Sequence, residues 1–417
     1  MSSKWQVSLC HGYGSMTINF GVPRQALQST RFKAHRKHLQ RLLVKFSLKH
    51  GILPASLFLS GVKLFGDECH SMGSFADIYI GDLGGTKVAL KRLRMFSMIE
   101  ESKRAQLRRS FHHESLIWRG LSHPHVLSFF GVNDTAFKRS PCMVSPWMEL
   151  GNIRSAADHL RQSLPAQAMV TQTLTWIQQI TSGLAYLHSE EIVHGDLRGP
   201  NILVDSDKMI KLADFGLAVF AEGASRNYGS TRGGNARWLS PELIHPELFG
   251  LSSDRPTYSS DVFALGCVCV EICTSQAPYA GISDHQVIAR VPYGLRPARP
   301  NFPDNTDLPD ALWSTIMLCW THTAVERPTA LSLVETTKAC ITRRELTPPL
   351  DDNVLSHDAV AAAADNVLGE RIVESTVHAW AGDRSDWQEY LQERKRAKSG
   401  SSPQWSRSHP GQNDAIL

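Results

Sequence analysis

Short, mainly apolar runs dominate the chain between about Ile52 and Trp147. Their pattern is typical of β-strands. The predicted strands span residues 77–81, 87–93, 126–131 and 142–147. One segment with helical spacing, residues 101–120, interrupts them.

Beyond Gly151 the apolar residues recur at helical spacing, most clearly over 174–188, 260–274 and 311–320. Strands that come first and helices that come later predict an α+β fold. We expect two lobes: a small β-rich N-lobe with one helix over 52–147, and a larger, mainly helical C-lobe over 152–343. Residues 344–417 are polar and predicted to be a partly disordered tail.

An extension at residues 1–51 precedes the first lobe and contains a basic amphipathic pattern. Apolar residues from Phe32 to Phe46 recur at helical spacing with Lys and Arg between them, which predicts a helix ending at Gly51. Three interpretations are open. The helix packs against the following domain, it docks to an anionic surface or partner, or it belongs to a mitochondrial transit peptide.

The charge balance is uneven along the chain. The formal net charge is +4, yet residues 1–66 hold ten Lys and Arg and no acidic residue. The basic character is therefore local, and no nucleic-acid recognition motif accompanies it, so no nucleic-acid partner is expected. No apolar stretch is long enough to predict a transmembrane segment, and the N-terminus lacks the layout of a secretory signal.

The chain has eight cysteines, of which Cys267, Cys269 and Cys273 lie inside one mainly apolar run. Their spacing predicts a buried helix and not a metal site, because no cysteine or histidine partners stand at hairpin spacing. Free thiols favour a reducing compartment, so a cytoplasmic location is expected, with a nuclear one also open.

A lysine that ends a predicted strand marks the first candidate site. Lys91 follows Val88, Ala89 and Leu90, and Glu114 lies 23 residues later in the helix-like segment. A lysine that holds the α- and β-phosphates of a nucleotide needs a carboxylate to fix its ammonium group. Residues 71–78 form a predicted strand–turn–strand that could cover such phosphates.

Two further motifs supply acids and an amide. In His194-Gly195-Asp196-Leu197-Arg198-Gly199-Pro200-Asn201, the Asp196 carboxylate can accept a proton from an attacking hydroxyl, and Asn201 offers an oxygen to Mg²⁺. Asp214, in Asp214-Phe215-Gly216, offers a second hard oxygen ligand 18 residues after Asp196. The two motifs together are specific for phosphoryl transfer with ATP and Mg²⁺.

With these motifs the sequence resembles protein kinases of the tyrosine-kinase-like group, most closely forms abundant in fungi, from about Ile52 to Arg343. The resemblance implies a bilobal kinase fold (domain 52–343), a protein substrate, and Arg198 as a group that stabilises the moving phosphoryl charge. It also implies a set of nucleotide-binding positions besides Lys91 and Glu114. These are Ser71, Gly73, Ile78, Ala89, Ser145 (the gatekeeper), Pro146, Met148 and Leu203.

The resemblance assigns structural roles as well. Trp118, Phe129, His194 and Phe215 are expected to stack as a spine. Glu242 is expected to pair with Arg327, and Asp261 is expected to accept hydrogen bonds from the catalytic-loop backbone.

Several positions depart from the family pattern. Only Gly73 remains of three phosphate-loop glycines, since Ser71 and Ala76 replace the others, which predicts weaker ATP binding. Gly195 replaces the arginine that precedes the catalytic aspartate, and Asn235 stands where many serine/threonine kinases place a threonine.

An active kinase, with serine or threonine as the expected acceptor, is the favoured function. A tyrosine or dual-specificity kinase and a pseudokinase scaffold that binds without transfer are the alternatives. Retention of Lys91, Glu114, Asp196, Asn201 and Asp214 favours activity.

Overall fold

The computed structural model describes residues 36–66, 68–72, 76–93, 101–137, 140–215, 219–220, 235–302 and 308–346. The tail at 344–417 thus lies outside the described residues from Thr347 onward, as do Gly73 and the first 35 residues. Within the described part of the chain, no helix is long and apolar enough to cross a membrane.

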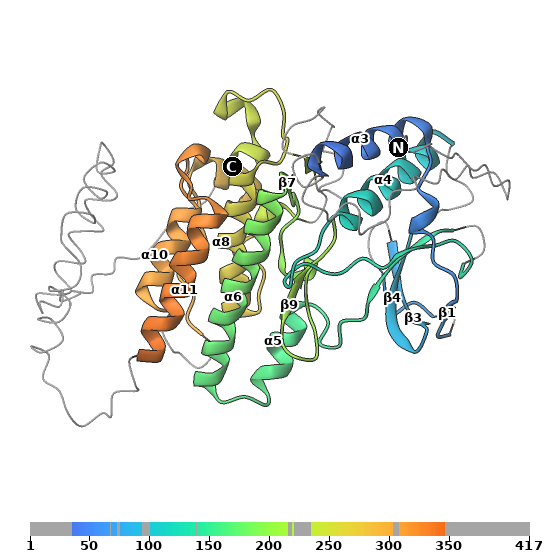
Figure 1. Ribbon diagram of the computed structural model, residues 1–417. Coiled ribbons are helices and arrows are strands. Elements are labelled where there is room, and N and C mark those ends of the chain that lie inside the picture. The colour runs from blue at the N-terminus through green and yellow to red at the C-terminus, as the bar shows by residue number, and fades with distance from the viewer. Residues whose placement is uncertain are drawn as a thin grey trace, which may run out of the picture. The chain divides into compact units, whose positions relative to one another are not determined.

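The small lobe is built around an antiparallel sheet with the strand order β1-β3-β4-β6-β5, and β2 also pairs with β3. Helix α4 (Glu101–Arg119) belongs to this lobe, and α3 (Arg36–His50) lies beside α4 (Figure 1). The strands are β1 (Val62–Leu64), β2 (Ser71–Met72), β3 (Ala76–Leu83), β4 (Thr86–Leu93), β5 (Gly131–Asn133) and β6 (Cys142–Pro146).

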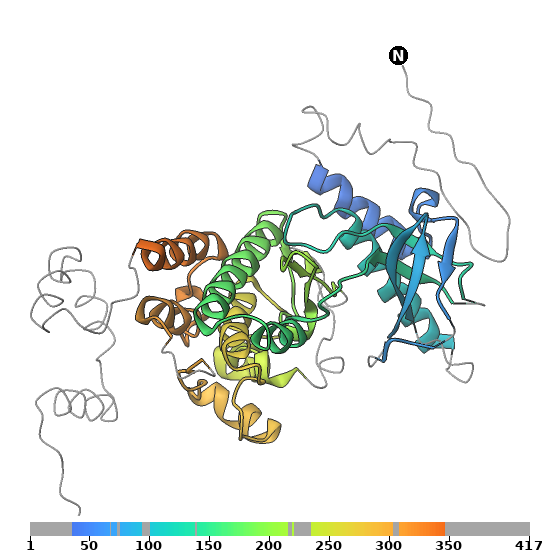
Figure 2. The same cartoon turned by 90° about the horizontal axis from the view of Figure 1, so that it is seen from below.

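The large lobe is mainly helical and carries two short β-pairs, β7 with β10 and β8 with β9 (Figures 1 and 2). Its helices are α5 (Ile153–Arg161), α6 (Ala166–Ser189), α7 (Pro241–Ile244), α8 (Tyr258–Thr274), α9 (Asp284–Arg290), α10 (Asp310–Cys319) and α11 (Ala330–Leu346). Its strands are β7 (Ile192–Val193), β8 (Ile202–Val204), β9 (Ile210–Leu212) and β10 (Val219–Phe220). The predicted α+β architecture of two lobes is confirmed.

Helix α8 is the centre of the large lobe. A capping box starts it: the Ser260 amide donates to Thr257 Oγ1 at 3.2 Å, and the Thr257 amide donates to Ser260 Oγ at 2.8 Å. Every residue from Ser260 to Cys273 is buried, as expected for a helix that is apolar on nearly all sides. Burial raises the pKa of the Cys267 thiol to about 12, so this cysteine packs as an apolar residue.

The strand predicted at 126–131 is wrong in its position. Strand β5 covers Gly131–Asn133, and Val126 makes only an isolated bridge to Leu212 of β9. The apolar residues before β5 were read as a strand, but Val126, Leu127 and Phe129 are buried core residues between α4 and β9. A short apolar run has the same pattern in a buried connection as in a strand.

An ion pair buried in the large lobe joins α7 to the segment before α11. Arg327 Nη1 and Nη2 each donate to one oxygen of Glu242 at 2.7 Å, and both side chains are almost fully excluded from solvent. Arg327 also donates to the carbonyl oxygens of Thr321 and Ser259. The guanidinium therefore connects three segments of the chain.

Replacement of Arg327 by leucine is expected to lower the free energy of unfolding by about 3–5 kcal/mol, because it leaves the Glu242 carboxylate buried without its cation. Urea unfolding measures the change. The double variant Glu242→Gln/Arg327→Leu removes the unpaired charge and should recover part of the loss. A double variant less stable than Arg327→Leu alone would contradict this explanation.

Candidate active site

Lys91 lies near the end of β4, where the sheet meets α4 and the large lobe. The register places it opposite Ile78 of β3 and Met143 of β6. Its ammonium donates to Glu114 Oε1 at 2.7 Å and to Asp214 Oδ1 at 2.8 Å. One cation thus connects a strand and a helix of the small lobe to the segment that follows β9.

Burial of Lys91 disfavours its charged form, but the two carboxylates, Asp214 first and then Glu114, outweigh that cost. The pKa of Lys91 is therefore raised above its usual range. The lysine is a permanent cation at any physiological pH, which suits a group that binds phosphate oxygens.

Asp214 has a backbone φ of +63°, in the left-handed region that residues other than glycine seldom adopt. This conformation costs free energy, and it persists because the segment is held on both sides. The Ala213 amide donates to the Asn201 carbonyl oxygen at 2.9 Å, and Phe215 is fully buried. Asp214 thereby reaches the same lysine as Glu114.

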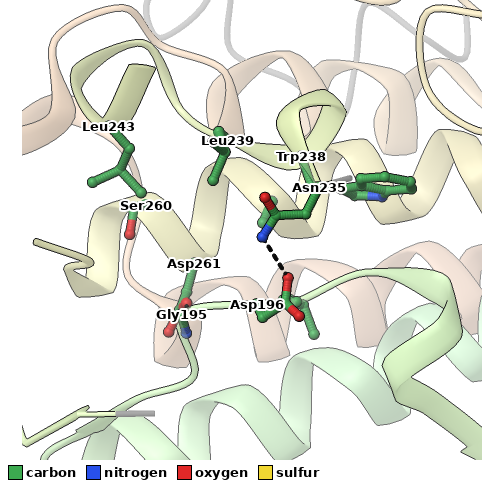
Figure 3. A pocket seen from close by; sticks show the side chains of 10 residues that line it. Gly195, Asp196, Asn235, Trp238, Leu239, Leu243, Ser260 and Asp261 are labelled. Carbon is green, nitrogen blue, oxygen red and sulfur yellow. Dashed lines mark hydrogen bonds between the residues drawn. The ribbon is translucent and has the colours of Figure 1, made fainter. Parts of the chain in front are cut away.

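The Asp196 carboxylate is fixed by side-chain donors from two parts of the chain. Asn201 Nδ2 donates to Oδ2 at 2.9 Å, and Asn235 Nδ2 donates to Oδ1 at 2.8 Å (Figure 3). Arg198 Nε also lies 3.2 Å from Oδ2. Asn201 Nδ2 donates to the Asp196 carbonyl oxygen as well, so the loop closes on itself.

Asp261 of α8 holds the backbone on the other side of Asp196. Its Oδ2 accepts from the His194 amide at 2.8 Å and lies 2.9 Å from His188 Nε2, while its Oδ1 accepts from the Gly195 amide at 2.9 Å. Figure 3 shows Asp261 and Gly195 close together, to the left of the Asp196 side chain. The expectation that Asp261 binds the loop backbone agrees with these contacts.

Glu271, three turns further along α8, holds the end of the same loop. Its Oε2 accepts from the Gly199 amide at 2.9 Å and from Trp238 Nε1 at 2.7 Å, and its Oε1 accepts from Arg154 Nε of α5. Burial raises the pKa of Glu271, and Arg154 with the other donors opposes that shift. A Cβ at residue 199 would collide with the Glu271 carboxylate, which the Gly199 amide and Trp238 hold in place, so glycine is favoured there.

Comparison with known proteins agrees with this geometry. Residues 68–337 match the family described as protein tyrosine and serine/threonine kinase. The chain belongs to the protein kinase family. The match covers most of both lobes and includes every active-site residue described above.

The kinase relatives come from plants, mosses and amoebae. The chain is 29% identical over 282 residues to mitogen-activated protein kinase kinase kinase 1b of Physcomitrium patens, covering 67% of this chain and 33% of the relative. It is 28% identical over 274 residues to serine/threonine/tyrosine-protein kinase HT1 of Arabidopsis thaliana, covering 65% of each. With serine/threonine-protein kinase STY46 of the same plant the identity is 30%, over 65% of this chain and 43% of the relative. The chain thus spans between a third and two thirds of the length of these relatives.

The expected spine of the kinase is a continuous stack of rings. Trp118 and Phe129 are stacked with centroids 4.9 Å apart, and Phe215 lies 5.9 Å from Trp118 and 5.5 Å from His194. Trp118 Nε1 also donates to the Leu127 carbonyl oxygen at 2.6 Å. Aromatic contacts of this kind add about 0.5–1.5 kcal/mol each to the burial of the rings.

The residues expected around the adenine lie on neighbouring strands. Ala89 of β4 is opposite Ile80 of β3 and Ser145 of β6, two register pairs away from Ile78 and therefore on the same face of the sheet. Leu203 of β8 bridges to Asn152, just beyond Met148 and the end of β6 at Pro146. Ser71 pairs with Ile78, whereas Gly73 lies outside the described residues. Ile78, Ala89 and Ser145 therefore lie on β3, β4 and β6, the three middle strands of the sheet, and Leu203 lies in the large lobe.

Sequence reasoning missed three residues of the site. Asn235 was taken as a departure from the family pattern, yet its amide makes the hydrogen bond to Asp196. The sequence does contain a signal for Glu271, which is an acidic residue inside the mainly apolar run 262–273. Arg154 gave no signal, since an arginine at the start of a helix is ordinary on a surface.

Replacement of Asn235 by alanine is expected to lower kcat about tenfold, because Asp196 loses one charge-assisted hydrogen bond and its orientation. The KM for ATP should change little, since Asn235 bonds Asp196 and not Lys91 or its partners Glu114 and Asp214. Steady-state phosphorylation assays measure both constants. Asn235→Thr keeps a donor and is the matched control; equal losses in the two variants would contradict an orienting role.

Proposed function

We propose that this chain is a protein kinase that transfers the γ-phosphate of ATP to serine or threonine hydroxyls of protein substrates. The observation that supports this most strongly is the pair of fixed groups described above. Lys91 is held by Glu114 and Asp214, and Asp196 is held by Asn201 and Asn235. Such positioning, together with electrostatic stabilisation, is what phosphoryl transfer requires of a protein.

Lys91, fixed by Glu114, would bind the α- and β-phosphates. Ile78, Ala89 and Leu203 would enclose the adenine beside the gatekeeper Ser145. The Pro146 carbonyl and the Met148 amide would bond the edge of the base. Ser71 and Gly73 would cover the phosphates. The Ser145 side chain is small and buried, and it would leave space behind the base.

Asp214 and Asn201 fit a Mg²⁺ ion through oxygen atoms. Asp214 offers a carboxylate, and Asn201 uses its Nδ2 on Asp196, which leaves its amide oxygen for a cation. Bound Mg²⁺ would neutralise negative charge on the oxygens of the phosphate that is transferred. In this arrangement Asp196 accepts the proton of the substrate hydroxyl, and Arg198 stabilises charge on the moving phosphoryl group.

Serine or threonine as the acceptor is favoured by the names of the relatives. Those of STY46 and the drkB protein of Dictyostelium discoideum specify serine/threonine. The name of HT1 adds tyrosine, so dual specificity is the second candidate. The proposed domains are an N-terminal extension (1–51), the kinase domain (52–343) and a tail (344–417). An anionic partner for the basic extension also remains a proposal, and the free thiols favour a cytoplasmic location.

The function is tested with radiolabelled ATP and a generic basic protein, with wild type and Asp196→Asn measured side by side. The wild type should incorporate label, and the variant should lose it by about a hundredfold or more, because the proton acceptor is removed. Equal signals would instead support a pseudokinase scaffold. Acid hydrolysis of the labelled product then identifies the acceptor, and phosphotyrosine alone would refute the serine/threonine assignment.

Replacement of Lys91 by methionine is expected to reduce turnover far more than it weakens nucleotide binding. The lysine positions phosphates for transfer, whereas the adenine contacts are made by other residues. Single-turnover rates and nucleotide affinity by calorimetry separate the two effects. Losses of similar size in both would count against this role of Lys91.

A further inference from the structure

Helix α3 lies before residue 68, where the match to the kinase family begins, and none of the catalytic or nucleotide-binding roles proposed above uses it. It runs alongside α4 in both views (Figures 1 and 2). Val44 and Ser47 on its inner side are buried, and Val44 belongs to the same core as Phe111 and Trp118 of α4. α3 is thus packed on the helix that carries Glu114.

The two helices also meet where α4 ends. Gly120 directly follows α4, and the side-chain amide of Gln40 lies against it, so a Cβ on residue 120 would displace that amide. The basic amphipathic helix predicted from the sequence therefore packs against the small lobe. This was the first of the three interpretations that its pattern left open.

The first half of α3 reaches the large lobe. Lys37 Nζ donates to the Ser189 carbonyl oxygen at 2.5 Å and lies 3.5 Å from Glu191 Oε1. Arg41 Nη2 donates to Glu191 Oε2. Ser189 is the last residue of α6, so the two cations also lie at a helix C-terminus, where positive charge is favourable. One helix therefore contacts both lobes.

Glu191 occupies an unusual backbone position for a residue with a side chain. It follows the C-cap of α6, Glu190, and its φ is +63°. Helices commonly end with a glycine in this left-handed conformation, because any Cβ there costs free energy. Lys37 and Arg41 contact the carboxylate of Glu191. The acid of this ion pair is therefore supplied by a residue whose backbone conformation costs free energy.

We propose that α3 is a brace that fixes α4 to the large lobe, and that Lys37 and Arg41 are positioning residues for Glu114. Asp214 belongs to the large lobe and Glu114 to α4, and Lys91 bonds both. Any displacement of α4 from the large lobe separates Glu114 from this group. The brace deepens the proposed kinase function and rests on it.

The size of the effect follows from exposure. The side chains of Lys37, Arg41 and Glu191 are 37%, 22% and 40% exposed, so water screens their attraction in part. Removal of one such pair should change the equilibrium between the placed and the displaced position of α4 roughly two- to fivefold, and not by orders of magnitude. The test therefore relies on charge reversal and rescue.

The first experiment measures amide hydrogen exchange of α4 in the full chain. Arg41→Glu and Glu191→Arg should each accelerate exchange in α4 and lower kcat about threefold. The double variant restores opposite charges and should recover both. Lys45→Glu makes a charge change of the same size on an exposed position of α3, and it should behave as wild type. If Arg41→Glu matches Lys45→Glu, or the double variant is no better than the single ones, the brace is refuted.

The second experiment uses Glu191→Gly, which separates positioning from stability. Glycine suits the left-handed backbone, so the thermal unfolding midpoint should stay equal or rise, while exchange in α4 should still accelerate. Unchanged exchange in α4 would refute the proposal. Hydrogen exchange does not depend on turnover, so a failure of the brace and a failure of the kinase assignment give different results.

Discussion

Two carboxylates buried on helix α8 determine the conformation of the catalytic loop. Asp261 and Glu271 are 1% and 0% exposed. A charge at such depth is tolerated only when hydrogen-bond donors surround it. The loop supplies the backbone amides of His194, Gly195 and Gly199. The same hydrogen bonds satisfy the two buried acids and position Asp196. The loop therefore cannot move without leaving a buried charge unsatisfied.

The second constraint is the single cation between the lobes. Lys91 is partly buried, with 21% of its side chain exposed, and Asp214 and Glu114 hold its pKa above the usual range in spite of that burial. These residues are 23 and 123 positions away from Lys91 in the sequence. The site is therefore complete only when the sheet, α4 and the segment after β9 are packed together. This is why a contact far from the nucleotide, such as that of Arg41 with Glu191, can affect the chemistry.

Much of this could be predicted from the sequence, because the residues with chemical roles stand in short motifs of fixed spacing. The sequence predicts that Glu114 fixes Lys91 and that Asp261 binds the loop backbone, and both contacts are present. The helix around Cys267 is buried as predicted. Strand β5 was misplaced because a buried connection has the same apolar pattern as a strand. Glu271 was missed because two of its partners are a backbone amide and an indole, which carry no pattern in the sequence, and Arg154 was missed because its partner is Glu271 itself, 117 residues away.

The site also shows how a departure from a family pattern is explained by local geometry. Gly195 was identified as the loss of an arginine, but its φ is +78°, a conformation that favours glycine, and its amide binds Asp261. A long side chain at that position would add strain to the turn that presents Asp196. The carboxylate is instead oriented from the far side by Asn235, whose amide donates to the oxygen opposite the one that Asn201 bonds. Glycine at 195 and asparagine at 235 thus belong to one arrangement, in which the neutral amides of Asn201 and Asn235, together with Arg198 of the loop, orient the Asp196 carboxylate.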